Sequence, residues 1–324
     1  ENANPPVLGT PISPDPLVVT EGENIADAAV FANFTDADGD TVYYSIDGLP
    51  DGTGISINPI TGQLIGTPTN ADSLAQPIMV TITATDGAFF AAAVDDLEIQ
   101  VSNTNNPPDF TSLPPGLDAG PPPTSAATQD VLYEYLITAT DPDPTDTLTI
   151  SGTYPAWLTL TDNGDGTATL SGTPTASDVF ESNQAVALVV TDSASATDTQ
   201  NFDIAIENVN DAPTFTSTEV ADADEGSLYT YDITTEDLDN DPVTITAPTK
   251  PAWLTLTDKG DGTATLTGTP AAADVGANPV VLEVTDGTAG PVQQSFTITV
   301  TNVNDTPIFT STPLVSAAEA AAYN

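Results

Sequence analysis

The chain has 324 residues, of which two are lysine or arginine and 47 are aspartate or glutamate, giving a formal net charge of −45. So few cations exclude the basic surfaces that bind nucleic acid or anionic membranes. The chain has no cysteine and no histidine, which excludes disulfides, thiolate and imidazole metal sites, and the usual general base. Hard cations bound by oxygen remain as the available metal chemistry.

The sequence contains no apolar run long enough to span a membrane, and its first residues do not form a signal peptide. We therefore expect no membrane contact in this segment, and a chain that is either mature or a fragment.

An asparagine-rich segment with proline recurs about every hundred residues, at positions 2–10, 103–112, 208–217 and 302–311. A fixed period of this length indicates tandem domains, and the stiff, oxygen-rich composition suits a joint better than a flexible linker. We expect domains at residues 1–104, 105–209 and 210–304, and the start of an incomplete fourth repeat at residues 305–324.

Each repeat has a close pair of aspartates after its first strand and another aspartate where its sixth strand ends. In the first repeat these acids are Asp36, Asp38, Asp40 and Asp86; in the second, Asp141, Asp143 and Asp192; and in the third, Asp237, Asp239 and Asp286. Calcium needs six to eight oxygens, so several loops must converge on one ion. Tandem domains offer such a place at their junctions.

The first repeat also joins a Gly-Leu-Pro turn at 48–50, a Thr-Gly hairpin at 61–62 and a Gly-Thr-Pro segment at 66–68. It has the richest aromatic group of the chain, Tyr43, Tyr44, Phe89 and Phe90. If Phe89 and Phe90 lie on a strand, one of them faces away from the core.

Repeats two and three share Pro-Ala-Trp-Leu-Thr-Leu-Thr-Asp at 155–162 and 251–258. We expect Trp157 and Trp253 to pack in the core, with sugar platforms as the alternative. The following pairs, Asp165 with Gly166 and Asp261 with Gly262, are typical of hairpin turns, with calcium loops as the alternative.

In the third repeat, apolar residues alternate with threonine in short segments. This period of two predicts seven short strands, at 214–216, 229–233, 243–245, 253–257, 263–267, 282–284 and 296–300. Seven strands separated by Gly, Pro, Asp and Asn turns predict an all-β sandwich.

The C-terminal residues 307–324 align with residues 213–229 and stop where a second strand would begin. Either the parent protein continues, which we expect, or this strand completes a neighbouring subunit by β-strand addition. A lone first strand would leave Ile308 and Phe309 without a core.

Together these motifs resemble the cadherin-like immunoglobulin domains of bacterial and archaeal extracellular adhesins and filaments, in the dystroglycan-type cadherin-like and Putative Ig families. The resemblance covers essentially the whole chain and implies a linear rod of seven-stranded immunoglobulin/cadherin-like β-sandwiches with calcium at the junctions. For the first junction it implies the ligands Glu21, Asp72, Asn103, Asn105, Asn106, Asp141, Asp143 and Asp192. For the second it implies Asp178, Asn208, Asn210, Asp211, Asp237, Asp239 and Asp286. The third repeat offers Glu225, Asp274, Asn302, Asn304 and Asp305.

The chain departs from the family pattern in several places: every linker is one residue shorter than the vertebrate form, Asp72, Asp178 and Asp274 match the usual acidic motif only loosely, and two single positions differ. Gln129 stands where the third repeat has Glu225, and Asn106 stands where the linker normally has aspartate. Fewer charges weaken calcium binding, so we expect unequal junctions. The alternative is that the acids only solvate the loops of a halophile-like surface.

These features predict a calcium-rigidified extracellular rod, part of a surface adhesin, stalk or filament. The alternatives are a carbohydrate- or protein-binding adhesion module and a filament subunit that donates its C-terminal strand. Expected partners are calcium ions, neighbouring repeats or like subunits, and a glycan or surface protein. An enzyme is not expected, because the acids lie in turns without a general base or an oxyanion cluster.

Overall fold

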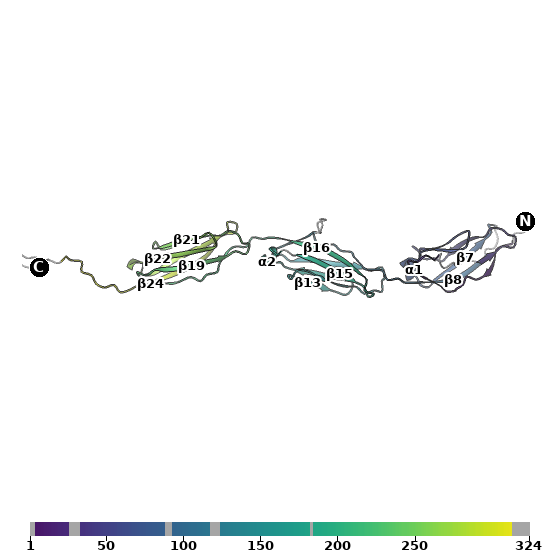
Figure 1. The fold of residues 1–324 in the computed structure, drawn as a ribbon, viewed down its shortest axis with the longest axis horizontal. Helices are drawn as coiled ribbons and strands as arrows, with labels where there is room; N and C mark the ends of the chain where they lie inside the picture. The colour runs from purple at the N-terminus through teal and green to yellow at the C-terminus, as the bar shows by residue number, and fades with distance from the viewer. Residues whose placement is uncertain (1–3, 26–32, 88–92, 117–123, 182–183, 313–324) are drawn as a thin grey trace, which may run out of the picture. The chain divides into compact units, whose positions relative to one another are not determined.

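The computed structural model describes residues 4–25, 33–87, 93–116, 124–181 and 184–312 (Figure 1). They group into two units, each described by itself. Unit 1 comprises the described residues of Glu1–Ala126, Glu134–Gly172 and Asn183–Ala205, and unit 2 those of Ala127–Tyr133, Thr173–Ser182 and Ile206–Asn324. The linker at residues 103–106 therefore lies inside unit 1, and the linker at 208–211 inside unit 2.

The third repeat is built from two four-stranded sheets, with the orders β17-β19-β22-β21 and β18-β24-β23-β20. The strands are β17 (Thr214–Phe215), β18 (Asp222–Asp224), β19 (Tyr229–Glu236), β20 (Thr244–Thr249), β21 (Leu254–Asp258), β22 (Thr263–Gly268), β23 (Gly276–Thr285) and β24 (Val292–Thr301). All seven expected strands are present. The additional strand, β18, has one buried apolar residue, Ala223, which is too short a pattern for alternation to reveal.

The second repeat has the same plan, with the sheet orders β10-β16-β15-β12 and β13-β14-β11-β9. Its strands are β9 (Asp109–Phe110), β10 (Thr124–Thr128), β11 (Tyr133–Thr140), β12 (Thr149–Thr153), β13 (Leu158–Asp162), β14 (Thr167–Gly172), β15 (Ala185–Thr191) and β16 (Thr197–Glu207).

The first repeat has one four-stranded sheet, β2-β8-β7-β4, and two pairs, β1-β3 and β5-β6. Its strands are β1 (Val7–Thr10), β2 (Leu17–Thr20), β3 (Asn33–Thr35), β4 (Tyr43–Asp47), β5 (Ile55–Ile57), β6 (Leu64–Gly66), β7 (Ile78–Thr85) and β8 (Ala93–Ser102). Short helices follow the Gly-Thr-Pro segments: α1 (Asn70–Leu74), α2 (Ala176–Val179) and the 3-10 turn η2 (Ala272–Asp274).

Alternate side chains of the strands form the cores, as the period of two predicts. In β19, Tyr229, Tyr231 and Ile233 are buried while the residues between them face solvent. Trp253 packs against this core, and its ring meets that of Tyr229 edge to face at 5.8 Å between centroids. The expected packing role of Trp253 is confirmed. Trp157 is half-buried and donates its indole N–H to Gln184 (2.8 Å).

The two Asp-Gly pairs are hairpin residues, as expected. Gly166 and Gly262 have φ values of 80° and 79°, in the region that glycine adopts without strain. Asp165 Oδ1 accepts the backbone N–H and the hydroxyl of Thr167 within its turn. Asp261 does the same with Thr263.

In the first and third repeats, a parallel strand pair leads to the linker. In the first repeat β2 runs parallel to β8, and in the third β18 runs parallel to β24. In each repeat, the residue directly after the short strand (β2, β10 or β18) donates its backbone N–H to the carbonyl of the last residue of β8, β16 or β24. These bonds are Glu21 to Ser102, Gln129 to Glu207 and Glu225 to Thr301, each 3.0 Å.

Candidate metal sites at the linkers

In unit 1, the linker is bonded to carboxylates of the second repeat. The Asn106 N–H donates to Asp143 Oδ2 (2.7 Å), and the Asn105 amide donates to Asp192 Oδ2 (2.8 Å). The other Asp143 oxygen accepts the amide of Asn70, on α1 of the first repeat (2.9 Å). Asp143 is 3% exposed, so charge-assisted bonds replace its lost hydration.

In unit 2, the linker repeats this pattern. The Asp211 N–H donates to Asp239 Oδ2 (2.5 Å), and the Asn210 amide donates to Asp286 Oδ2 (2.8 Å). Ala176 stands at the place of Asn70 in the second repeat, so the matching amide donor is missing. Asp239 Oδ1 is buried without a hydrogen-bond partner.

Among the described residues, two groups of three aspartates could each hold a cation. They are Asp141, Asp143 and Asp146 in unit 1, and Asp237, Asp239 and Asp241 in unit 2. Within each group, one ligand atom from each residue lies within 4.8 Å of the others. Asp146 and Asp241 were not among the expected ligands. Comparison with Asp40 could have revealed Asp241, whereas one extra residue in the loop moves Asp146 out of that spacing.

Both groups contain buried carboxylate oxygens that make no hydrogen bond. These are Oδ2 of Asp141 and Asp146 in unit 1, and Oδ2 of Asp237 and Oδ1 of Asp239 in unit 2. A buried anionic oxygen without a donor is costly unless a cation or a proton compensates it. The donors are all oxygens, so the residues fit a hard cation such as calcium.

The ionisation of the surrounding acids follows from their contacts. Burial raises the pKa of Asp141, and the charges of Asp143, Asp146 and Asp192 add to the rise, against a hydrogen bond from the Asp143 N–H. The Asn105 amide lowers the pKa of Asp192. In unit 2 the Asn210 amide lowers the pKa of Asp286. The linker amides thus stabilise charged carboxylates beside each group.

The acids of the first repeat are more exposed to solvent than the two groups above. Asp36 Oδ1 accepts the N–H groups of Asp38 (2.8 Å) and Asp40 (3.1 Å), and its Oδ2 is buried without a hydrogen-bond partner. Asp38 and Asp40 are exposed, and Asp38 accepts the N–H of Asn4 (2.8 Å). Asp86 is half-buried just after β7. Within the described residues, these acids form no group like the two above.

The expected acids after the fifth strands cap short helices. Their Oδ2 atoms accept the N–H of the residue before the helix: Asp72 from Thr69 (2.8 Å), Asp178 from Thr175 (2.7 Å) and Asp274 from Ala271 (2.9 Å). Asp72 is fully buried and also accepts the Gly54 N–H (3.0 Å). Each of these acids thus stabilises the start of a helical turn, and Oδ1 of Asp72 is buried without a hydrogen-bond partner.

The remaining expected ligands do not form a compact group of oxygens. Asn103 accepts the Ser73 hydroxyl (2.9 Å), and Asn208 is exposed. Glu225 is half-buried and accepts the Val303 N–H (3.3 Å). Asn302, Asn304 and Asp305 are exposed. The structure therefore does not bring the third set together.

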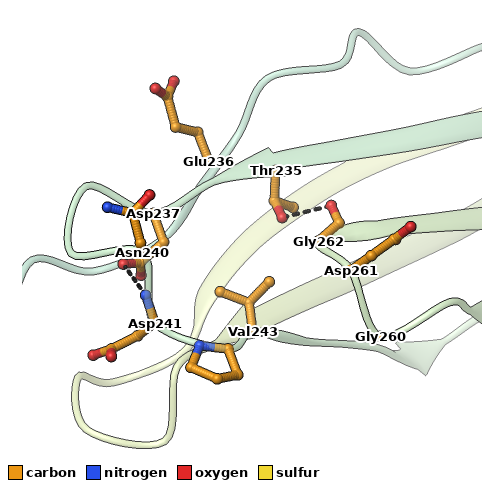
Figure 2. Close-up of a pocket in the computed structure, with 10 residues that line it drawn as sticks. Thr235, Glu236, Asp237, Asn240, Asp241, Val243, Gly260, Asp261 and Gly262 are labelled. Carbon is orange, nitrogen blue, oxygen red and sulfur yellow. Dashed lines mark hydrogen bonds between the residues drawn. The ribbon is translucent and has the colours of Figure 1, made fainter.

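A hollow of about 480 Å³ lies beside the acidic loop of the third repeat (Figure 2). One side carries Asp237 and Asp241, joined by a hydrogen bond from the Asp241 N–H (3.1 Å). The opposite side carries the hairpin residue Asp261, whose carboxylate points away from that loop (Figure 2). Asp261 thus stabilises its own hairpin turn. The group of Asp237, Asp239 and Asp241 instead contacts the linker, through Asp239.

The paired sheets, and the asparagine-rich linkers bonded to aspartates of the next repeat, define tandem immunoglobulin- and cadherin-like domains, a class that suggests an extracellular adhesion or structural module. The family model described as Putative Ig domain matches residues 5–102, 111–207 and 212–301. The chain belongs to this family and contains three tandem copies. In the part of the chain that the structure describes, no helix has the length and apolar character needed to cross a membrane.

The chain is also similar to solved structures. Extracellular cadherin domains 1–5 of Protocadherin Gamma B2 match with a TM-score of 0.51 and 13% identity, over 94% of this chain and 61% of that one. The Protocadherin GammaB4 extracellular domain gives 0.47 and 17%, over 92% and 49%. An endo-fucoidan hydrolase of glycoside hydrolase family 107 gives 0.31 and 24%, over 94% and 45%. The chain spans about half the length of these chains. No curated protein matches it significantly.

Proposed function

We propose that this chain is an extracellular structural rod, rigidified by calcium at its linkers, and a segment of a repetitive surface adhesin, stalk or filament. The observation that carries the proposal is the pair of aspartate groups with buried, unpartnered oxygens beside the two linkers. A formal charge of −45 supports it, because bound cations reduce the self-repulsion of such a chain.

Different residues would bind the ion and fix the linker. In unit 2, Asp237, Asp239 and Asp241 would hold calcium, while Asn210 fixes the linker to Asp286. Calcium binds the ordered group and hardly binds the unfolded chain. Its binding therefore stabilises the junction, by about 2.7 kcal/mol at a hundred times the dissociation constant.

The test is calcium titration by calorimetry, with the Asp237→Asn variant. In the wild type, Asp237 Oδ1 accepts the N–H groups of Asp239 and Asp241, and Oδ2 has no hydrogen-bond partner. Asparagine keeps the first oxygen and replaces the second by an NH2 group. We expect the affinity of this site to fall at least about tenfold, because a charged ligand is lost. The matched control is Asp261→Asn, in the hairpin, which should leave calcium binding unchanged.

Rigidification is tested separately by solution scattering with calcium and with chelator. A chain stiffened at its linkers should shorten its maximum dimension when calcium is removed. An unchanged dimension together with no calcium binding would contradict the proposal and favour acids that only solvate the surface.

A second candidate function is filament assembly by strand donation from the C-terminal segment. Ile308 is 81% and Phe309 is 99% exposed, whereas Phe215, in the matching segment of the third repeat, pairs with β19 and packs against the core. Amide exchange at residues 306–312 tests it. Protection that appears only as concentration rises supports donation, and fast exchange at all concentrations contradicts it.

An adhesion module that binds a carbohydrate or protein is a further alternative. In the aromatic group of the first repeat, Tyr43 is 45% exposed, while Tyr44 packs against the core. Phe89 and Phe90 lie outside the described residues. Titration against a glycan array separates this alternative from a pure spacer, which should bind nothing. Domains of this class are typically non-enzymatic.

A further inference from the structure

One side chain in each repeat reaches to the linker from just after the short strand that lies beside the last strand. Its oxygen accepts a linker N–H in all three repeats: Glu21 from Thr104 (3.4 Å), Gln129 from Val209 (3.3 Å) and Glu225 from Val303 (3.3 Å). The common bonds show that the three side chains occupy matching places, although one of them is a carboxamide.

In the first two repeats, this side chain also bonds the last residue of the asparagine-rich run. In unit 1, the Asn106 amide donates to Glu21 Oε1 (3.1 Å). In unit 2, the Gln129 amide donates to Asp211 Oδ2 (2.7 Å). Asn106 and Asp211 match in the linker, so the acid and the amide have exchanged places. Glu21 is 9% and Gln129 is 1% exposed, and Asn106 and Asp211 are half-buried, so both bonds are partly shielded from water.

We propose that Glu21 with Asn106, and Gln129 with Asp211, are cation-independent clamps that join each repeat to its linker. A buried carboxylate is satisfied by an amide donor through a charge-assisted hydrogen bond. Two carboxylates at the same separation would repel unless a proton or a cation lay between them. Each pair keeps one charge and one amide, so neither needs a cation at this point.

The clamp limits where calcium binds. Each linker then holds calcium at its aspartate group alone and not at the clamp, a statement that rests on the proposed function. The third repeat has Glu225 and Asp305 at the two positions, so it lacks the amide, and the structure records no bond between them among the described residues. Asn106 and Gln129, which look like lost ligands in the sequence, are thus each the amide partner of an acid at their own linker.

The test compares the wild type with Gln129→Glu and with the exchanged double variant Gln129→Glu/Asp211→Asn, in the full chain. In chelator, Gln129→Glu should lower the Tm of the transition that involves this linker by about 5 °C or more, because a charge-assisted bond becomes a repulsion. The double variant has the arrangement of unit 1 and should recover at least half of that loss.

Calorimetry gives the second readout. Gln129→Glu should bind one more calcium ion than the wild type, and the double variant should return to the wild-type number. The matched control is Gln293→Glu, which removes an exposed amide-to-carboxylate bond to Glu283 (2.7 Å) and should change the Tm and the ion count little.

Three results would overturn the clamp. They are an unchanged Tm for Gln129→Glu in chelator, no recovery in the double variant, and a loss no larger than that of Gln293→Glu. If no variant binds calcium, the proposed function fails, while the melts in chelator still decide on the clamp. The two failures are therefore distinguishable.

Discussion

Asp143 is the side chain whose loss should most weaken the linker in unit 1. It is 3% exposed and accepts two N–H donors, from Asn106 at 2.7 Å and from Asn70 at 2.9 Å. In Asp143→Asn, one acceptor oxygen becomes an amide that faces a donor. Hydrogen bonds to a charged group contribute about 1.5–3 kcal/mol each, and a buried donor left unpaired costs a similar amount. We therefore expect a loss of about 3 kcal/mol.

The assay is thermal unfolding in chelator, which separates these bonds from any bound ion. For a cooperative unit of about 150–250 residues, 1 kcal/mol shifts the Tm by about 2–4 °C, so the expected decrease is about 6–12 °C. The control, Asp165→Asn, changes an exposed carboxylate that also accepts two bonds, from Thr167, and should have little effect. An unchanged Tm for Asp143→Asn would show that the linker is not held by this carboxylate in solution.

Three further outcomes are expected. A Cβ on Gly172 would lie 2.0 Å from the Trp157 carbonyl oxygen, so Gly172→Ala should lower the Tm strongly in a melt, whereas Gly290→Ala, in open space, should not. Burial raises the pKa of Tyr229. The neutral phenol therefore adds stability to the folded state that is complete below the unfolded pKa of about 10. This stability is lost as the pH rises from there through the higher pKa of the folded state. Alkaline unfolding followed by circular dichroism should shift to higher pH in Tyr229→Phe. In chelator, sodium chloride should raise the Tm by screening the net charge of −45; a flat or falling Tm would contradict self-repulsion.

The strands were predictable because their signal is local. Alternation of apolar residues with threonine places Tyr229, Tyr231 and Ile233 on one face of β19, and one face is all that a sandwich requires. Strand β18 was not predictable, because its pairing with β24 is set by residues about eighty positions away. A strand of three residues with a single buried alanine carries no periodic pattern.

The acids at the linkers were predictable in type, but their partners were not. Repetition along the sequence identified Asp143 and Asp239. It could not show that Asn106 compensates Glu21, because the bond between them depends on how the parallel strand meets the linker. A residue that looks like a lost ligand in the sequence can therefore be the hydrogen-bond partner of the remaining acid in space.

The parallel strand pair has a mechanical consequence. In the third repeat the pairs are Asp222 with Thr299, Ala223 with Val300, and Asp224 with Thr301. Tension along the chain pulls β18 toward its N-terminal end and β24 toward its C-terminal end, so the two strands are drawn past each other lengthwise. Hydrogen bonds loaded in this shear direction bear the force together, whereas a hairpin pulled from its open end loses them one at a time. The three-residue strand β18 is thus placed where its hydrogen bonds resist stretching together.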